Sequence, residues 1–222
     1  AGDAVELAAG RLGVEMAADD YRRQLGVPSR AQRHHAAHLV DRDGAAGGLG
    51  RSFALRLAAR GGKLVLGDID EAGLAETKRL VDTSGGSASI QRCDVSKIGD
   101  VEQLFARAED VLGGTDLLIN NAGVAVGGPI GKIPLSDWEW IMGINLWGVI
   151  YGCHTFLPKM RERRSGHILN VASIAAFANA GEMGPYNTTM AAVVALTETL
   201  AGELVGTGVG ATVLCPFFFK TN

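Results

Sequence analysis

From Arg51 onward, the chain alternates between helical and strand-like patterns of apolar residues. Apolar side chains recurring every three or four positions predict amphipathic helices, and short runs of Val, Ile and Leu bounded by turn residues predict buried strands. The predicted helices span 51–60, 71–81, 100–112 and 185–205, with one or two more between 136 and 163. The predicted strands span 63–68, 88–95, 116–120, 167–172 and 211–215. This alternation predicts an α/β fold, a doubly wound parallel sheet with helices on both faces in three layers.

The strand expected ahead of the glycines at 44–50 fits this pattern least well. As the first strand of a doubly wound sheet it would lie in the middle, and such strands usually read as continuous Val, Ile and Leu. Residues 36–43 read Ala-Ala-His-Leu-Val-Asp-Arg-Asp instead. This local disagreement counts against easy folding.

Residues 1–35 do not share the alternation. They mix Arg, Ala, Asp and Gln, and the apolar positions between Val5 and Ala18 fit one loose amphipathic helix. We therefore expect an irregular N-terminal extension over 1–35 and a single domain over 36–222. A length of 222 residues agrees with one domain, since single cores keep growing to roughly 250 residues before they divide.

Composition and charge narrow the class of protein. Apolar residues make up 47% of the chain and charged residues 20%, which suits a buried core and excludes a disordered chain. A formal net charge of -3 disfavours nucleic acid as a partner, because phosphate-backbone binders carry a basic stripe. No apolar run reaches the roughly 20 residues of a membrane span, and no signal peptide is recognisable. The expected location is the cytoplasm.

Cysteine and histidine positions favour neither a disulfide framework nor a metal site. The cysteines are Cys93, Cys153 and Cys215. They are widely spaced and form no Cys-x-x-Cys pair, so we expect buried free thiols in a reducing compartment. His34, His35 and His38 have Gln and Arg neighbours and no suitably spaced carboxylate or Cys, so no metal is expected.

Residues 44–50, Gly-Ala-Ala-Gly-Gly-Leu-Gly, are a candidate phosphate-binding loop at the start of a helix. Glycine lets the backbone approach a pyrophosphate, whose charge is met by free N–H groups at the helix N-terminus. The glycine spacing alone is explained equally well by a flexible loop that binds nothing. Asp68 changes this balance, because it ends the next strand about twenty residues on, where a carboxylate accepts hydrogen bonds from both ribose hydroxyls. A carboxylate there repels a 2′-phosphate, which favours NAD over NADP.

Further motifs follow along the chain. Asp94 precedes Val95, residues 120–123 read Asn-Asn-Ala-Gly, and Asn145, Ser173 and Tyr186 come later at wide intervals. With the glycine loop, and although Asp43 stands where Thr is usual, these motifs resemble the short-chain dehydrogenase/reductase family over 39–222. The resemblance implies a Rossmann-like fold, with Asn145, Ser173 and Tyr186 as catalytic residues. The cofactor-binding residues that it implies are Gly44, Gly48, Leu49, Gly50, Asp68, Asp94, Val95, Asn121, Ala122, Gly123, Tyr186, Pro216 and Thr221.

Taken alone, each motif also has a structural explanation. Residues 120–123 would suit a strand-ending turn, because Asn and Gly tolerate left-handed backbone. Asn145 would suit a helix-interior residue bonded to a carbonyl, Ser173 a cap, and Tyr186 an amphipathic core residue. Their joint occurrence at the family's spacing favours the functional interpretation. An S-adenosylmethionine-dependent methyltransferase would share the glycine loop but would leave 120–123, Ser173 and Tyr186 unexplained.

Met190 stands where the resemblance implies a lysine. In the family, the tyrosine exchanges a proton with the substrate oxygen, the serine holds that oxygen, and the asparagine orders a water. The lysine lowers the tyrosine pKa and hydrogen-bonds the nicotinamide ribose. Tyr186 and Met190 are four residues apart and so share one helix face, yet a thioether has neither charge nor a hydrogen-bond donor. We therefore expect impaired turnover.

The C-terminal segment also departs from the family. Phe217 stands where glycine is usual, and its ring could crowd the nicotinamide. The sequence stops at Asn222, before the family's helical substrate lid and last strand, which would leave the strand at 211–215 as an exposed edge. The irregular opening, the poor first strand and this ending together suggest an inaccurate or truncated gene reading.

Two functions remain open. The first is an NAD-dependent oxidoreductase that transfers hydride between the nicotinamide and a secondary alcohol or ketone, impaired at position 190. The second is a non-catalytic relative that binds a dinucleotide or a partner protein. Small apolar residues over 174–184 favour an apolar substrate. By resemblance, the helices over 145–163 and 185–205 are the expected surfaces of a homodimer or tetramer.

Overall fold

The computed structural model describes residues 35–39 and 45–217, with only the backbone described over 35–39. The predictions for the N-terminal extension, Gly44, Thr221 and the side chains of the three N-terminal histidines lie outside the described residues.

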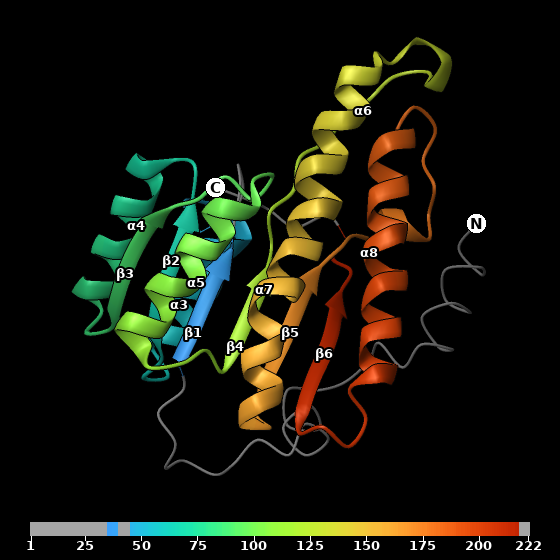
Figure 1. Ribbon diagram of the computed structural model, residues 1–222. Coiled ribbons are helices and arrows are strands. Elements are labelled where there is room, and N and C mark those ends of the chain that lie inside the picture. Colours follow the sequence, from blue (N-terminus) through green and yellow to red (C-terminus); the bar gives the residue numbers. More distant parts are fainter. Residues whose placement is uncertain (1–34, 40–44, 218–222) are drawn as a thin grey trace. The chain divides into compact units, whose positions relative to one another are not determined.

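Parallel strands form one sheet in the order β3-β2-β1-β4-β5-β6 (Figure 1). The strands are β1 His35–Leu39, β2 Lys63–Asp68, β3 Ser87–Arg92, β4 Leu117–Asn120, β5 Gly166–Val171 and β6 Val209–Leu214. The strand order changes direction between β1 and β4, which is the switch point of a doubly wound sheet. The predicted fold is confirmed, and β1 has the central place expected of the strand ahead of the glycine loop. In the described part of the chain β6 is an edge strand, as predicted.

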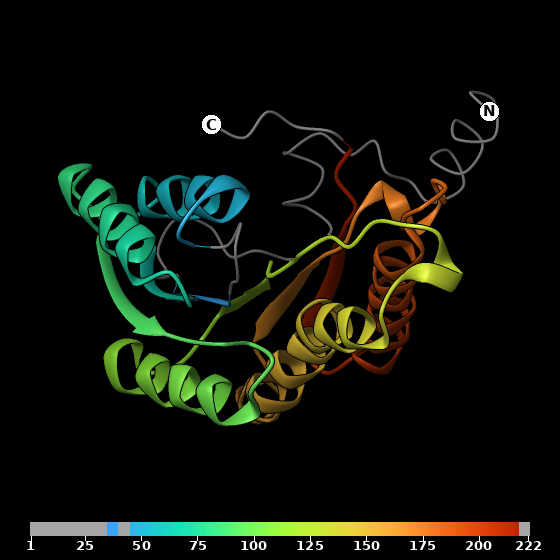
Figure 2. The same ribbon diagram turned by 90° about the horizontal axis from the view of Figure 1, so that it is seen from above.

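Helices cover both faces of the sheet, with α3 and α4 on one face and α5, α7 and α8 on the other (Figure 2). The long helices are α3 Gly48–Ala58, α4 Glu71–Thr83, α5 Ile98–Leu112, α7 Gly148–Arg163 and α8 Gly184–Glu203. The shorter ones are η1 Ile130–Lys132, α6 Leu135–Met142, η2 Gly143–Trp147 and η3 Ile174–Ala176. The three-layer arrangement is therefore also as predicted.

The predicted element boundaries differ from the observed ones most at two helices. The strand over 63–68 is confirmed without change, but α3 begins at Gly48, inside the glycine run, rather than at Arg51. The region predicted as one or two helices is interrupted by a π-helical turn, η2, between α6 and α7. Such turns insert an extra residue into a helix and are frequent at functional sites.

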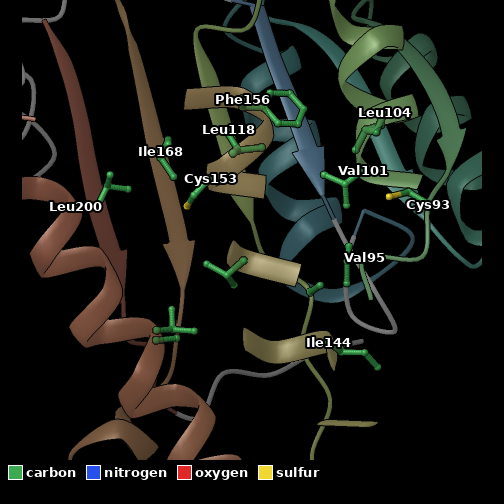
Figure 3. Close-up of a cluster of buried hydrophobic side chains, with 14 of the residues drawn as sticks. Cys93, Val95, Val101, Leu104, Leu118, Ile144, Cys153, Phe156, Ile168 and Leu200 are labelled. Carbon is green, nitrogen blue, oxygen red and sulfur yellow. The ribbon is translucent and has the colours of Figure 1, made fainter. Parts of the chain in front are cut away.

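Among the described residues, the larger of two cores lies between the sheet and α5, α7 and α8 (Figure 3). Leu118, Phe156 and Ile168 are at most 1% exposed. The rings of Phe105 and Phe156 meet edge to face at 5.1 Å, a favourable aromatic geometry. The smaller core, under α3 and α4, contains several alanines, which let these helices approach the sheet closely.

A chain of polar side chains crosses the larger core. Asn120 Nδ2 donates to Asn170 Oδ1 at 2.8 Å, and Asn170 Nδ2 donates to Thr197 Oγ1 at 2.9 Å. All three residues are at most 3% exposed. Because buried polar groups are costly without partners, this chain favours one placement of α8 on β4 and β5.

The thiols are free, as expected, but they are not equally buried. Burial raises the pKa of Cys93 to about 12 and that of Cys153 to about 11, so both remain protonated near neutral pH. Cys215 is half-buried. In the described part of the chain, none of the helices combines the length and the apolar character that a membrane span requires.

Gly152 offers a test of this packing, because a Cβ built there lies 2.2 Å from Asn120 Oδ1. We expect Gly152→Ala to displace Asn120, break its bond to Asn170 and lower the free energy of unfolding by about 2 kcal/mol. Gly99 in α5 is the control, since a Cβ there meets nothing within 4 Å. Gly99→Ala should be neutral or slightly stabilising in urea denaturation. Equal stability of the two variants would contradict this account of the core.

Candidate active site

The carboxyl ends of the strands bring the sequence-predicted residues to one edge of the sheet. Leu39 pairs with Asn120, and Asn120 with Asn170, so β1, β4 and β5 end at the same level. The pairing continues beyond β5 and β6, where Ile174 N donates to Pro216 O at 3.0 Å. The carboxyl ends of β1 and β4 therefore flank the switch point, where doubly wound sheets bind their ligands.

The glycine loop begins α3, as predicted. Gly47 is the N-cap in extended backbone, and Gly48 has a φ of 43°, a left-handed conformation that glycine adopts readily. A Cβ built at Gly47 meets no described atom within 4 Å. The first turn, which includes Leu49 and Gly50, contains no acidic side chain. An anion at this helix end would therefore meet backbone N–H groups and the positive end of the helix dipole.

Side chains from α3 and α4 hold the loop in shape. Thr77 Oγ1 donates to Ala45 O at 2.6 Å, and Arg51 Nε donates to Thr77 Oγ1 at 2.9 Å. The Arg51 guanidinium also donates to Ala46 O. The sequence motifs did not single out Arg51 or Thr77, because their partners are only brought close by the packing of α4 on α3.

Asp68 is fully buried beside this loop. Its carboxylate accepts hydrogen bonds from Ala46 N at 3.0 Å and from Asp70 N at 2.9 Å. The predicted ribose acceptor thus also anchors the glycine loop to the end of β2. This second role was not foreseen, since nothing in the sequence pairs Ala46 with Asp68.

Asp94 and Val95 follow β3 at the same edge. Burial raises the pKa of Asp94, but hydrogen bonds from Ser96 and Lys97 outweigh it and hold that pKa below its usual value, so the carboxyl is ionised near neutral pH. Lys97 Nζ lies 3.0 Å from Asp94 Oδ2. Val95 packs closely on α7, because a Cβ built at Gly148 would lie 2.9 Å from its Cγ2.

Asn145 ties the loop after β4 to η2. Residues Asn121 and Ala122 are buried, and Val124 N donates to Asn145 Oδ1 at 2.8 Å. Asn145 Nδ2 returns a hydrogen bond to Val124 O at 2.9 Å. The predicted catalytic asparagine therefore fixes the backbone directly after Gly123, the last residue of the Asn-Asn-Ala-Gly motif.

Ser173 and the segment after it approach the loop that follows β4. Ser173 Oγ accepts from Ala175 N at 3.2 Å, which caps η3 and leaves the serine's own proton to donate elsewhere. Gly128 N donates to Glu182 O at 2.6 Å, and Glu182 has a φ of 62°, which is uncommon for a residue other than glycine. The segment 174–184 and the loop after β4 are thereby clasped together just ahead of α8.

Tyr186 and Met190 lie in the first half of α8, a helix that runs beside β6 (Figure 1). Met190 is 3% exposed and belongs to the larger core, and the partly buried Tyr186 packs against that core. A thioether suits these apolar surroundings, whereas an ammonium group there would be costly without a polar partner. Further along the edge, Phe217 follows Pro216 and is 66% exposed.

Within the described ranges, 35–39 and 45–217, the sequence-predicted site residues thus lie at or beside one edge of the sheet. They are the residues of the glycine loop, Asp68, Asp94, residues 121–123, Asn145, Ser173, Tyr186 and Pro216. In the same ranges no three His, Cys, Asp or Glu side chains gather as a metal site would require.

A family model described as short chain dehydrogenase matches residues 43–222. The chain belongs to the short-chain dehydrogenase/reductase family. The fold agrees: a short-chain dehydrogenase/reductase from Burkholderia phymatum, solved in complex with NAD, superposes with a TM-score of 0.81 at 38% identity, over 86% of this chain and 69% of that one. The resemblance deduced from the motifs is therefore confirmed.

Two curated relatives are longer than this chain, and the chain matches only part of each. The probable oxidoreductase EphD of Mycobacterium tuberculosis is 36% identical over 202 residues, which are 90% of this chain and 34% of that relative. The CLA biosynthesis dehydrogenase/reductase of Lactiplantibacillus plantarum is 38% identical over 182 residues, 81% of this chain and 64% of the relative. The chain thus spans about a third of the first relative and less than two thirds of the second.

The double role of Asp68 can be tested through stability. In Asp68→Asn, only one side-chain oxygen remains, so either Ala46 N or Asp70 N loses its acceptor. We expect the free energy of unfolding to fall by about 1–3 kcal/mol. Asp82→Asn is the matched control, because Asp82 lies on the surface of α4 in an ion pair with Lys78, and its loss should cost less than about 1 kcal/mol. Equal urea midpoints for the two variants would show that Asp68 does not anchor the loop.

Proposed function

We propose that this chain binds a nicotinamide dinucleotide across the carboxyl edge of its sheet, with NAD preferred to NADP. The observation that carries the proposal is the N-terminus of α3 at Gly47, where a Cβ would meet no described atom within 4 Å. It lies at the same end of the sheet as the loop that Asn145 holds. The fit to a dinucleotide rests on the chemistry of the edge: backbone N–H groups for the pyrophosphate, Asp68 for a ribose, and Asp94 with Val95 for the adenine. The related Burkholderia phymatum structure, which contains NAD, supports it.

Asp68 is the reason to favour NAD. Its buried carboxylate would face a 2′-phosphate across a short distance and in surroundings with little water to screen the repulsion. Pro216, Tyr186 and residues 121–123 complete the set of groups proposed to contact the cofactor, together with Gly44 and Thr221 outside the described residues.

The proposed reaction is hydride transfer between the nicotinamide and a secondary alcohol or ketone. The cofactor supplies or accepts the hydride, while Tyr186 gives or takes the proton at the substrate oxygen. Ser173 is suited to hold that oxygen, since its Oγ accepts from Ala175 and its proton is left for the substrate. By the family resemblance, Asn145 would order a water between the site and solvent. Its side chain is bonded to Val124 and Thr189, so its main chain would have to hold that water.

Met190 is proposed to make this reaction slow. An ordinary tyrosine has a pKa of about 10, and general acid-base catalysis works best when the pKa lies near the operating pH. If a lysine normally lowers the tyrosine pKa by two to three units, its absence costs roughly 3 to 4 kcal/mol in driving force for proton transfer. This corresponds to a rate loss of about two to three orders of magnitude. Phe217, beside the proposed nicotinamide position, would add crowding.

An apolar substrate is favoured by exposed apolar side chains on the segments between β4 and α8. Ile130 is 66% exposed, Leu135 78% and Phe177 42%. Ile130 lies against the start of α8, since a Cβ built at Gly184 would be 2.8 Å from its Cγ1. Ile130 therefore adds apolar surface beside the first turn of α8, which carries Tyr186.

The second candidate is a non-catalytic relative that binds the dinucleotide without turning it over. The burial of Met190 favours it, because position 190 is filled by an apolar side chain that suits its surroundings. The two candidates share the cofactor site and differ only in turnover.

Self-association through α7 and α8 is also proposed. An open, largely apolar groove of about 700 Å³ runs along these helices, lined by Ile150, Leu157 and Leu196 among others. Arg161 and Glu162 also line this groove. In a two-fold arrangement, the positive and negative side chains of one copy could pair with those of the second copy.

The turnover proposal is tested by Met190→Lys. We expect at least a tenfold rise in NADH-dependent reduction of apolar ketones, because the ammonium would lower the tyrosine pKa and hydrogen-bond the ribose. The variant should be less stable without cofactor, since the new charge is buried. Met190→Leu is the control and should remain as slow as the native chain. Equal rates for the lysine and leucine variants, with NADH bound by both, would overturn the account of position 190 and favour the non-catalytic candidate.

The association proposal is tested by light scattering after size exclusion. Leu196→Glu places a charge in the groove and should convert a dimer or tetramer into a monomer. Leu135→Glu, on a surface outside the groove, should leave the assembly unchanged. A native monomer, or an assembly that both variants retain, would refute the use of α7 and α8.

A further inference from the structure

Asn145 has a third hydrogen bond that the proposed reaction does not explain. Its Oδ1 and one Nδ2 proton are used by Val124, and the second Nδ2 proton is donated to Thr189 Oγ1 at 3.2 Å. The side chain is 1% exposed, so water does not compete for these groups. Every hydrogen-bonding group of the amide is therefore used.

The hydroxyl of Thr189 has a defined direction. It donates to Tyr186 O at 2.9 Å, and since a hydroxyl has a single proton, it must accept from Asn145 through a lone pair. Thr189 is fully buried. A continuous chain of hydrogen bonds thus runs from the backbone of Val124 through Asn145 and Thr189 to the backbone of Tyr186.

We propose that Thr189 is a positioning residue that holds the loop after β4 and the first turn of α8 in one relative placement. Apolar contacts, such as those of Met190 and Val193 with the core, bury this helix face but tolerate small sliding or rotation. The hydroxyl bond has a direction and a length, so it favours one register. Its effect on cofactor affinity rests on the proposed function, whereas its effect on the loop does not.

Removing the hydroxyl leaves a specific defect. In Thr189→Val, which keeps the shape of the side chain, one Asn145 N–H loses its acceptor inside the protein. We expect the side-chain amide of Asn145 to rotate toward another acceptor, which would weaken the two hydrogen bonds that it makes with Val124. Thr189→Ser restores the hydroxyl and should restore the bonds.

Hydrogen exchange followed by mass spectrometry tests the loop directly. We expect amide exchange in the segment around Val124 to accelerate about tenfold in Thr189→Val and to remain within about twofold of the native rate in Thr189→Ser. Thr197→Val is the matched control, since it removes a buried hydroxyl from the same helix that bonds to Asn170 instead. It should lower overall stability without selective exchange around Val124.

NADH titration by fluorescence adds the functional readout. Thr189→Val should raise the Kd for NADH about tenfold, while Thr189→Ser and Thr197→Val stay within about twofold of the native value. The positioning role is overturned if exchange around Val124 is unchanged in Thr189→Val, or if Thr197→Val accelerates it equally. If no variant binds NADH but the exchange pattern is as expected, the proposed cofactor fails and the role of Thr189 stands.

Discussion

The side-chain amide of Asn145 is hydrogen-bonded to both backbone groups of Val124, and the arrangement of the candidate site depends on this pairing. It joins two regions that the sheet alone does not connect, the loop at the switch point and the π-helical turn between α6 and α7. A π-helical turn is unfavourable in isolation and persists where side-chain contacts hold it. Here the buried amide supplies those contacts, and its third bond extends the same order to α8 through Thr189.

Position 190 lies on the helix that this network fixes, and the surrounding structure accommodates a methionine without disturbance. The hydrogen bonds of Asn145, the cap at Ser173, the clasp between Gly128 and Glu182 and the anchored glycine loop are all made without a charge at 190. The hydrogen-bonded contacts along the described edge therefore form with a methionine at 190. Dinucleotide binding and turnover are therefore treated as two separate proposals for this chain.

Much of the fold could be predicted from the sequence, because alternating periodicities and turn residues act locally. The strand over 63–68 follows from such patterns. Despite the weak apolar character of residues 36–43, β1 pairs on both sides through its backbone. That this segment counts against easy folding stays a prediction. The roles of Arg51, Thr77 and Thr189 could not be predicted, since each depends on a partner that only packing brings near. The π-helical turn was missed for the same reason. The glycines at 143 and 148 do not by themselves predict such a turn, which depends on the contact between Asn145 and Val124.

Calorimetric titration of NADH into the native chain tests the central claim most directly, because it asks whether the edge built around Asn145 and the glycine loop binds a dinucleotide despite Met190. The account predicts saturable, stoichiometric binding, weakened when NADPH replaces NADH because of Asp68. Absence of saturable NADH binding at millimolar concentration, in a chain shown to be folded by circular dichroism, would contradict it.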